Sequence, residues 1–197
     1  MAAEPEQVPI VVKVGGSLYD VPDLGPRLLR WLQTLPTSHI VLVPGGGATA
    51  DVIRDLDRCH KLGEVRSHWL ALRALGLNAR FLKTLLPRSA VVSDWTRCPT
   101  HWEANRLPIL DCFKFVRADE GNSGHLPHTW AVTSDSVAAR LAVVMGAAKL
   151  ILLKSVSAPA GWDSNVAGLE GIVDVHLATV AASLSQVTLV NLRAWQA

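Results

Sequence analysis

The stretch from Val8 to Asp20, VPIVVKVGGSLYD, is the part of the sequence that most constrains the fold. Up to Val14 it is a run of mainly β-branched apolar residues broken by one charged residue, Lys13, and the glycines Gly15 and Gly16 follow this run. A continuous apolar run of this length, closed by glycine, is typical of a buried strand in a parallel sheet. We therefore predict an α/β fold in which this strand occupies the interior of the sheet.

Lys13 is unusual in such a strand, because an unpaired ammonium group is costly to bury. Near the carboxyl end of the strand, however, its side chain can reach the edge of the sheet where α/β proteins bind ligands. Gly15 and Gly16 allow backbone N–H groups to come close to an anion, and Ser17 adds a hydroxyl group. The segment predicts a phosphate-binding strand and turn. A core strand with an outward-reaching lysine and a tight turn is the alternative.

A second segment has the same order of features. His39–Val43 reads as another apolar strand, and Pro44 and the glycines Gly45, Gly46 and Gly47 follow it. The next residues, Ala48–Arg58, have the apolar spacing of a helix. A glycine-rich turn between a strand and a helix N-terminus favours an anion or substrate site, although neither G-x-x-x-x-G-K-[ST] nor G-x-G-x-x-G is present.

Four short segments together resemble the amino acid kinase family, which includes acetylglutamate, carbamate, uridylate and isopentenyl phosphate kinases. They are VVKVGGSL, VLVPGGG, TSDSVAARLA and LILLKSV, and the resemblance extends to about Ser155. The segments SHWLA, at 67–71, and WAVTSDS, at 130–136, resemble a smaller branch of the family, that of the aminomethyl-furanmethanol phosphate kinases of methanofuran biosynthesis. The resemblance implies a three-layer αβα sandwich with a mainly parallel central sheet.

The resemblance also implies roles for individual residues. Asp135, at the start of a helix, is expected to hold the phosphate-binding Lys13 in place, although it could be only a helix cap. His68, in a helix, is expected in the acceptor site, although it could simply be satisfied by nearby backbone. The expected nucleotide- or phosphate-binding residues are Gly15, Gly16, Ser17, Ser134 and Ser155. The expected acceptor-binding residues are Gly45, Gly46, Gly47 and His68.

Two departures from the family concern the nucleotide side. Lys154-Ser155-Val156 stands where most relatives have Thr-Asp-Val, and the usual Gly-Gly-Met-x-x-Lys segment with a second lysine is absent from the later sequence. The chain is therefore expected to be shortened on its nucleotide side. We predict that Lys154 replaces the second lysine and is catalytic together with Lys13 and Asp135.

Composition limits the possible functions. The chain has 197 residues, is 49% hydrophobic and carries a formal net charge of +2, which suits one amino acid kinase-like domain over residues 1–197. The nearly balanced charge favours neither nucleic acid nor an anionic membrane as a partner. No apolar run reaches membrane-spanning length, Met1–Gln7 lacks a signal-peptide pattern, and the three cysteines fit reduced thiols, so a cytoplasmic protein is expected. His125 and His128 lack a suitable companion, so no metal site is expected.

The remaining elements follow from apolar spacing and from proline and glycine breaks. Helices are expected at 22–35, at 64–81 with a weak point at Gly76, and at 177–184. A further helix is expected to begin at Ser134 or Asp135, either of which could cap it. Strands are expected at 90–94, within 107–115, at 149–156 and at 187–192. Residues 96–105 are expected to be irregular, and 117–127 to form a polar loop.

These observations favour an ATP-dependent phosphotransferase with nucleotide-bound Mg²⁺. The expected acceptor is a small phosphorylated or carboxylated molecule, such as a furanmethanol phosphate, and a homodimer is compatible with the family. The alternative is a non-catalytic protein on the same fold that binds a small anion or a nucleotide. A structural subunit of a catalytic partner is a third possibility.

Overall fold

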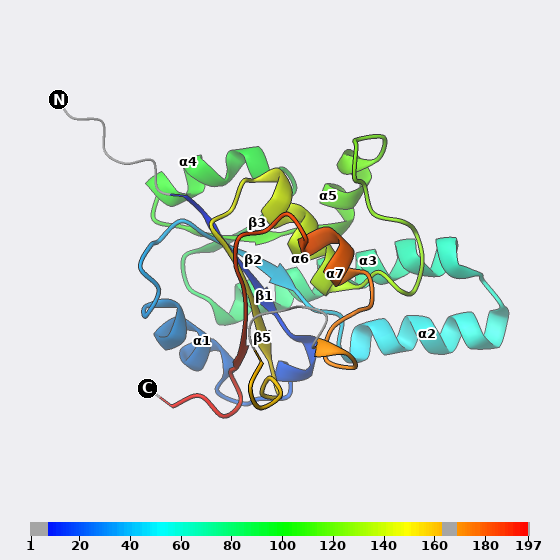
Figure 1. Cartoon of the computed structure of the whole chain (residues 1–197), viewed down its shortest axis with the longest axis horizontal. Helices are drawn as coiled ribbons and strands as arrows, with labels where there is room; N and C mark the ends of the chain where they lie inside the picture. The colour runs from blue at the N-terminus through cyan, green and yellow to red at the C-terminus, as the bar shows by residue number, and fades with distance from the viewer. Residues whose placement is uncertain (1–7, 163–168, 197) are drawn as a thin grey trace.

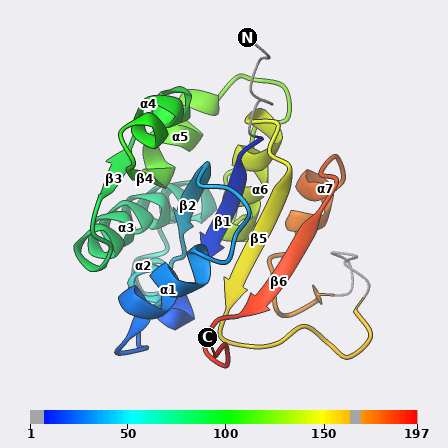
Figure 2. The same cartoon turned by 90° about the vertical axis from the view of Figure 1, so that its left-hand side faces the viewer.

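The central sheet of the computed structural model contains six strands within the described residues, 8–162 and 169–196, and all of them are parallel (Figures 1 and 2). Their order is β3-β4-β2-β1-β5-β6, so the first strand lies inside the sheet, as its apolar sequence predicts. The strands are β1 (Ile10–Val14), β2 (Ile40–Pro44), β3 (Ser89–Val92), β4 (Leu107–Leu110), β5 (Lys149–Lys154) and β6 (Val187–Asn191). The predicted α/β class is confirmed, and the sheet is wholly rather than mainly parallel.

Helices cover both faces of the sheet and complete the three layers. On one face, α1 (Leu24–Leu32) packs its leucines against β1 and β2. On the other face lie α5 (Cys112–Asp119), α6 (Ser134–Val144) and α7 (Leu177–Ala181). The long helix α3 (Glu64–Leu85) contributes to both apolar cores, and with α2 (Ala48–His60) it projects to one side of the molecule (Figure 1).

The alternation of side chains along the strands brings the two unusual lysines to the same face. In β1, Ile10, Val12 and Val14 face the α1 layer, whereas Val11 faces the α6 layer. Lys13 has the same parity as Val11 and therefore also faces α6. In β5, Leu150 and Leu152 face the α6 layer, so Lys154 does as well. Lys13 pairs in register with Leu152, so Lys154 lies two residues beyond Lys13 in the sheet register, on the same face and nearer the carboxyl edge.

Two predictions for the region between α3 and α6 are wrong. Residues 96–105, expected to be irregular, contain η2 (Trp95–Arg97) and α4 (Cys98–Glu103). The Asp94 side chain caps this turn by accepting a hydrogen bond from the Thr96 N–H group at 3.0 Å. The strand expected within 107–115 ends at Leu110, because Asp111 accepts a hydrogen bond from the Lys114 N–H group and starts α5.

The other differences are in element boundaries. Helix α3 continues past Gly76 to Leu85 without a break, since Gly76 lies on a buried helix face with ordinary packing distances. The helices α1 and α7 are shorter than expected, and β5 ends at Lys154. Among the described residues, no helix is both long and apolar enough to cross a membrane. The expectation for Met1–Gln7 lies outside the described residues.

Candidate functional site

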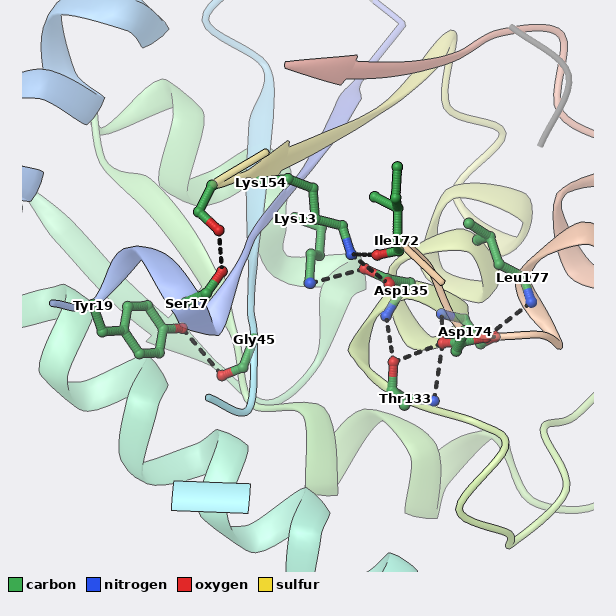
Figure 3. A network of polar contacts seen from close by, with 12 residues as sticks. Lys13, Ser17, Tyr19, Gly45, Thr133, Asp135, Lys154, Ile172, Asp174 and Leu177 are labelled. Carbon is green, nitrogen blue, oxygen red and sulfur yellow. Dashed lines mark hydrogen bonds and ion pairs between the residues drawn. The ribbon is translucent and has the colours of Figure 1, made fainter. Parts of the chain in front are cut away.

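The centre of the candidate site is a buried group of three charged side chains at the carboxyl ends of β1 and β5 (Figure 3). Lys13 Nζ lies 2.8 Å from Asp135 Oδ1, and Lys154 Nζ lies 2.7 Å from Asp135 Oδ2. Each lysine thus contacts a different oxygen of the same carboxylate. The ion pair predicted between Lys13 and Asp135 is present, and Lys154 joins it from the neighbouring strand.

This group carries an unbalanced charge, because two ammonium groups share one carboxylate. Burial alone would raise the pKa of Asp135, but the positive charges of Lys13 and Lys154 outweigh it and lower that pKa, so Asp135 is ionised at neutral pH. Burial and the neighbouring Lys13 lower the pKa of Lys154 to about 8, despite the opposing effect of Asp135. The site therefore carries about one net positive charge at neutral pH and is suited to an anion.

The N-terminus of α6 holds Asp135 in position. The helix cap is Thr133, whose side-chain oxygen accepts a hydrogen bond from the Asp135 N–H group at 3.4 Å, rather than Ser134 or Asp135 as the sequence suggested. Asp135 is therefore free of capping and directs its carboxylate to the lysines. A second carboxylate, that of Asp174, accepts hydrogen bonds from Thr133 and Ser136 in the same turn (Figure 3).

The two glycine turns pack directly against each other beside the lysines. A Cβ atom on Gly16 would lie only 2.1 Å from the Gly47 nitrogen, and one on Gly45 would lie 2.3 Å from the Gly16 nitrogen. Gly47 also has a φ of 54°, in the left-handed region that favours glycine. Neither turn could accept a side chain at these positions without moving the other, so the glycines fix how closely the two turns approach.

Two side chains hold the second glycine turn in place. Asn78 Nδ2, from α3, donates hydrogen bonds to the Gly45 and Gly46 carbonyl oxygens at 2.7 and 2.8 Å. The Tyr19 hydroxyl group donates to the Gly45 carbonyl oxygen at 3.1 Å (Figure 3). Asn78 and Tyr19 thus hold the turn through its carbonyl oxygens, and neither side chain lines the cleft.

A cleft of about 200 Å³ opens beside the charged group. It is lined by both lysines, by the two glycine turns, by the start of α6 and by side chains from α2 and α3. The lining residues used below are Lys13, Gly16, Gly46, Gly47, Arg54, His68, Trp130, Ser134, Asp135 and Lys154. The cleft therefore joins the predicted phosphate-binding residues to a more distant wall made by α2, α3 and Trp130.

That distant wall contains a cation and an aromatic ring. The Arg54 guanidinium group lies 5.1 Å from the centroid of the Trp130 ring, within the range of a cation–π interaction. The indole N–H group of Trp130 donates to Asp57 Oδ2 at 2.8 Å, which is the main cause of the lowered pKa of Asp57. The loop before α6 is thereby attached to α2. The wall thus presents an aromatic ring and a guanidinium group, and the Arg54 guanidinium also pairs with Asp51 at 2.7 Å.

His68 lies in the cleft wall and its ring is held by backbone, while its role in acceptor binding stays a prediction. Its Nδ1 lies 3.1 Å from the Thr129 carbonyl oxygen, which requires that Nδ1 carry a proton. Burial lowers the pKa of His68, and the Nδ1 contact only partly opposes this effect, so the ring is neutral at neutral pH.

Four of the predicted binding residues are not among those that line the cleft: Gly15, Ser17, Gly45 and Ser155. Gly15 and Gly45 make close backbone contacts with Leu153 and Gly16, respectively. The Ser17 and Ser155 hydroxyl groups lie 2.9 Å apart and join the first glycine turn to the end of β5. Gly16, Gly46, Gly47, His68 and Ser134 do line the cleft.

The sequence interpretation missed five residues of the site: Arg54, Asn78, Trp130 as a wall residue, Ile172 and Asp174. Asn78 could have been found, because an amide inside the apolar face of a helix needs a buried partner. Arg54 offered no signal beyond its residue type, and Trp130 entered only as part of the WAVTSDS segment at 130–136. Ile172 contributes only its carbonyl oxygen, which accepts a hydrogen bond from Lys154 Nζ at 2.8 Å.

The described residues contain no group of three or more His, Cys, Asp or Glu side chains arranged to hold a metal ion. In the cleft, each oxygen of the Asp135 carboxylate lies within 2.8 Å of a lysine ammonium group. The donor set therefore suits a magnesium ion only when that ion arrives with the phosphates of a ligand, which supply its oxygen ligands together with water.

The parallel sheet between two helical layers, with its site at the carboxyl ends of the strands, defines an open three-layer α/β protein. Within this class, the chain belongs to the amino acid kinase family, whose model matches residues 9–158. It is similar to the [5-(aminomethyl)furan-3-yl]methyl phosphate kinase of Methanocaldococcus jannaschii, with 27% identity over 149 residues. That match covers 74% of this chain and 65% of the archaeal enzyme, so the chain matches just under two thirds of the length of that relative.

Two solved structures share the fold. The uridylate kinase of Archaeoglobus fulgidus superposes with a TM-score of 0.59 and 17% identity, covering 92% of this chain and 100% of that chain. The UMP kinase of Ureaplasma parvum superposes with a TM-score of 0.68 and 12% identity, covering 94% of this chain and 90% of that one. At these identities the likeness establishes the three-layer architecture.

Proposed function

We propose that the protein is an ATP-dependent phosphotransferase that acts on a small phosphorylated acceptor. The observation that carries the proposal is the pair of buried lysines that share Asp135 at the edge of the cleft. Phosphoryl transfer needs positive charge and accurate positioning around the moving group rather than covalent chemistry from the protein. Lys13 and Lys154, counted together with the Asp135 carboxylate, supply one net positive charge, and the shared carboxylate fixes the positions of both ammonium groups.

In this proposal, Lys13 and Lys154 stabilise the negative charge on the transferred phosphoryl group, and Asp135 holds them. The N–H groups of the turn at Gly16 and of the α6 N-terminus at Ser134 face the donor phosphates. An oxygen of the acceptor forms a bond to the γ-phosphorus of ATP, while the bond to the bridging oxygen breaks and ADP leaves with that electron pair. Magnesium, when bound to the nucleotide, neutralises part of the phosphate charge.

The far wall of the cleft suits the acceptor. Gly46 and Gly47 lie at the N-terminus of α2, where backbone N–H groups favour an anion. Arg54 adds a positive charge and Trp130 adds a flat apolar surface. A phosphate monoester on a small ring satisfies all three features, and the furanylmethyl phosphate named for the archaeal relative is the first candidate. Such an acceptor is already ionised, so its attack requires no general base.

The first test is isothermal titration with ATP and with a non-hydrolysable analogue, both with magnesium. The proposal predicts binding that is lost in Lys13→Met and retained in Lys83→Met, a matched control on the exposed end of α3. Absence of binding at millimolar nucleotide would refute the proposal. Where binding is found, an acceptor screen that starts with small phosphomonoesters follows, with ADP release as the readout.

A second variant tests the role of Lys154. The expected result for Lys154→Met is a large loss of turnover together with weaker nucleotide binding, because one of two cations on the phosphates is removed. Normal turnover in this variant would show that Lys154 is only a partner of Asp135. Lys83→Met again serves as the control for loss of a lysine charge.

A non-catalytic anion-binding protein remains the second candidate, and one observation favours it. Two N–H groups at the start of α6, those of Thr133 and Ser136, are already engaged by the protein's own carboxylate, Asp174. Thermal shift distinguishes the two functions. Stabilisation by inorganic phosphate without magnesium, and none by ATP with magnesium, would favour the anion-binding protein.

A further inference from the structure

Asp174 joins the C-terminal part of the chain to the start of α6 (Figure 3). Its Oδ2 atom accepts hydrogen bonds from the Thr133 N–H group at 3.0 Å, the Thr133 hydroxyl at 2.7 Å and the Ser136 N–H group at 3.0 Å. Its Oδ1 atom accepts from the Ser136 hydroxyl and from the Leu177 N–H group. Both carboxylate oxygens are thus fully used as acceptors, and four of the donors belong to α6 or its cap.

The same short segment also holds Lys154. The Ile172 carbonyl oxygen, two residues before Asp174, accepts a hydrogen bond from Lys154 Nζ at 2.8 Å. The segment itself is closed by backbone hydrogen bonds from the N–H groups of Ile172 and Val173 to the Leu169 carbonyl oxygen. One turn of chain therefore fixes the helix that carries Asp135 and, independently, the lysine that Asp135 contacts.

We propose that Asp174 is a positioning residue of the phosphate site, which anchors the turn at residues 169–174 so that Asp135 and the Ile172 carbonyl group together orient Lys154. This inference rests on the proposed phosphotransferase function. Within the described part of the chain, Asp174 makes no ion pair with Lys13 or Lys154 and acts only through Asp135 and the Ile172 carbonyl group. An ammonium group has three N–H donors, and with two of them fixed, Lys154 retains one for a phosphate oxygen.

The number of donors distinguishes Asp174 from an ordinary helix cap. A capping side chain usually accepts one or two N–H groups from its own turn, and Thr133 already provides that cap. Asp174 comes from a distant segment and supplies a negative charge where the α6 dipole favours one. Asp174→Asn would replace one acceptor oxygen by an NH₂ group that faces hydrogen-bond donors, so the turn would lose both the charge and half of its acceptors.

The kinetic test compares Asp174→Asn, Lys154→Met and the double variant. If Asp174 acts through Lys154, Asp174→Asn lowers kcat by up to about 100-fold, the effect of a misplaced catalytic group, while the KM of the acceptor stays unchanged. The double variant then falls no further than the worse single variant, because both changes disable the same unit. Additive losses, or a rise in kcat, would overturn the proposal.

Two further variants separate positioning from folding. Asp94→Asn removes a capping carboxylate at the opposite edge of the sheet and is expected to keep full activity. Ser136→Ala removes a single bond to Asp174 and tests the same network if Asp174→Asn does not fold. A kcat loss in Ser136→Ala that is smaller than about 100-fold, with a native circular dichroism spectrum, supports the proposal. A Ser136→Ala variant with the kcat of the wild type would count against the role of Asp174.

A readout that does not depend on catalysis is the titration of Lys154, followed by NMR of isotope-labelled lysine and assigned with Lys154→Met. In the wild type, Lys154 is expected to titrate near pH 8. In Asp174→Asn, the released segment exposes Lys154, so its titration moves up towards that of an ordinary lysine, about 10.4. An unchanged titration in the folded variant would refute the positioning role. A wild type that binds no ATP would refute the phosphotransferase while leaving this test intact.

Discussion

The shared carboxylate of Asp135 should be the most sensitive single position for stability, and Asp135→Asn tests this. In the wild type, two ammonium groups and one carboxylate leave one net positive charge in a buried site. The variant leaves two positive charges there, with exposed side-chain fractions of only 6% for Lys13 and 10% for Lys154. Little water is available to compensate for the lost carboxylate.

Removing one member of a buried ion pair typically costs about 3–5 kcal/mol of the free energy of unfolding. For a chain of this size, about 2–4 °C of melting temperature is lost per kcal/mol, so the expected decrease is about 6–20 °C. The assay is thermal unfolding followed by circular dichroism at pH 6 and pH 9. The double variant Asp135→Asn, Lys154→Met restores one net positive charge and should recover part of the loss.

The pH dependence identifies the cause. Lys154 has a pKa of about 8 in the folded protein, and without Asp135 it loses its proton at a still lower pH. The defect of Asp135→Asn should therefore be largest at pH 6 and smaller at pH 9, where Lys154 is neutral. Asp119→Asn provides a matched control, because it breaks a buried carboxylate pair with Arg140, at 2.7 Å, which stays charged at both pH values.

Two results would refute this reasoning. One is a loss below about 1 kcal/mol, which is the range of an exposed ion pair. The other is a defect that is equal at pH 6 and pH 9, as in the Asp119 control, because the neutralisation of Lys154 would then have no effect on stability.

Four further predictions concern Lys154, two glycines and Arg54. The pKa of Lys154 is lowered on folding, so the unfolded chain binds more protons than the folded protein between about pH 8 and 10.4. In this window, the free energy of unfolding of the wild type relative to Lys154→Met should rise with pH, by at most about 1.4 kcal/mol per pH unit. Urea titrations at several pH values measure this rise. Gly16→Ala should cost about 1–3 kcal/mol and weaken ATP binding, because its Cβ would meet Gly47. Gly76→Ala, with its nearest neighbour at 3.6 Å, should instead stabilise α3 by up to about 1 kcal/mol in the same titrations; a loss would contradict the packing. Arg54→Gln should raise the KM of an anionic acceptor with kcat retained in steady-state assays, and an unchanged KM would exclude Arg54 from acceptor binding.

Much of the sheet could be predicted from local sequence. The strands at Ile10–Val14 and Ile40–Pro44 are apolar runs followed by glycine, and such runs are typical of buried strands in a parallel sheet. The helix of residues 112–119 could not be read in the same way. Its alternating apolar residues resemble a strand, and the outcome depends on Asp111 as a cap and on the neighbouring helices that bury Phe115 and Val116.

For the site, the sequence by itself determined the side chains with unusual chemistry: a lysine near the end of each of two buried strands, and an aspartate at a helix start. Strand parity then placed Lys13 and Lys154 on one face, because alternate side chains point the same way. Only the tertiary structure decided what holds them. The segment at residues 169–174 reaches α6 through Asp174 and Lys154 through Ile172, and these contacts depend on how the chain returns after β5. A hydrogen bond to a backbone carbonyl oxygen, such as that of Ile172, does not depend on a particular side chain. Ser136 and Asp174 are 38 residues apart, and a contact over such a distance produces no periodic pattern in the sequence.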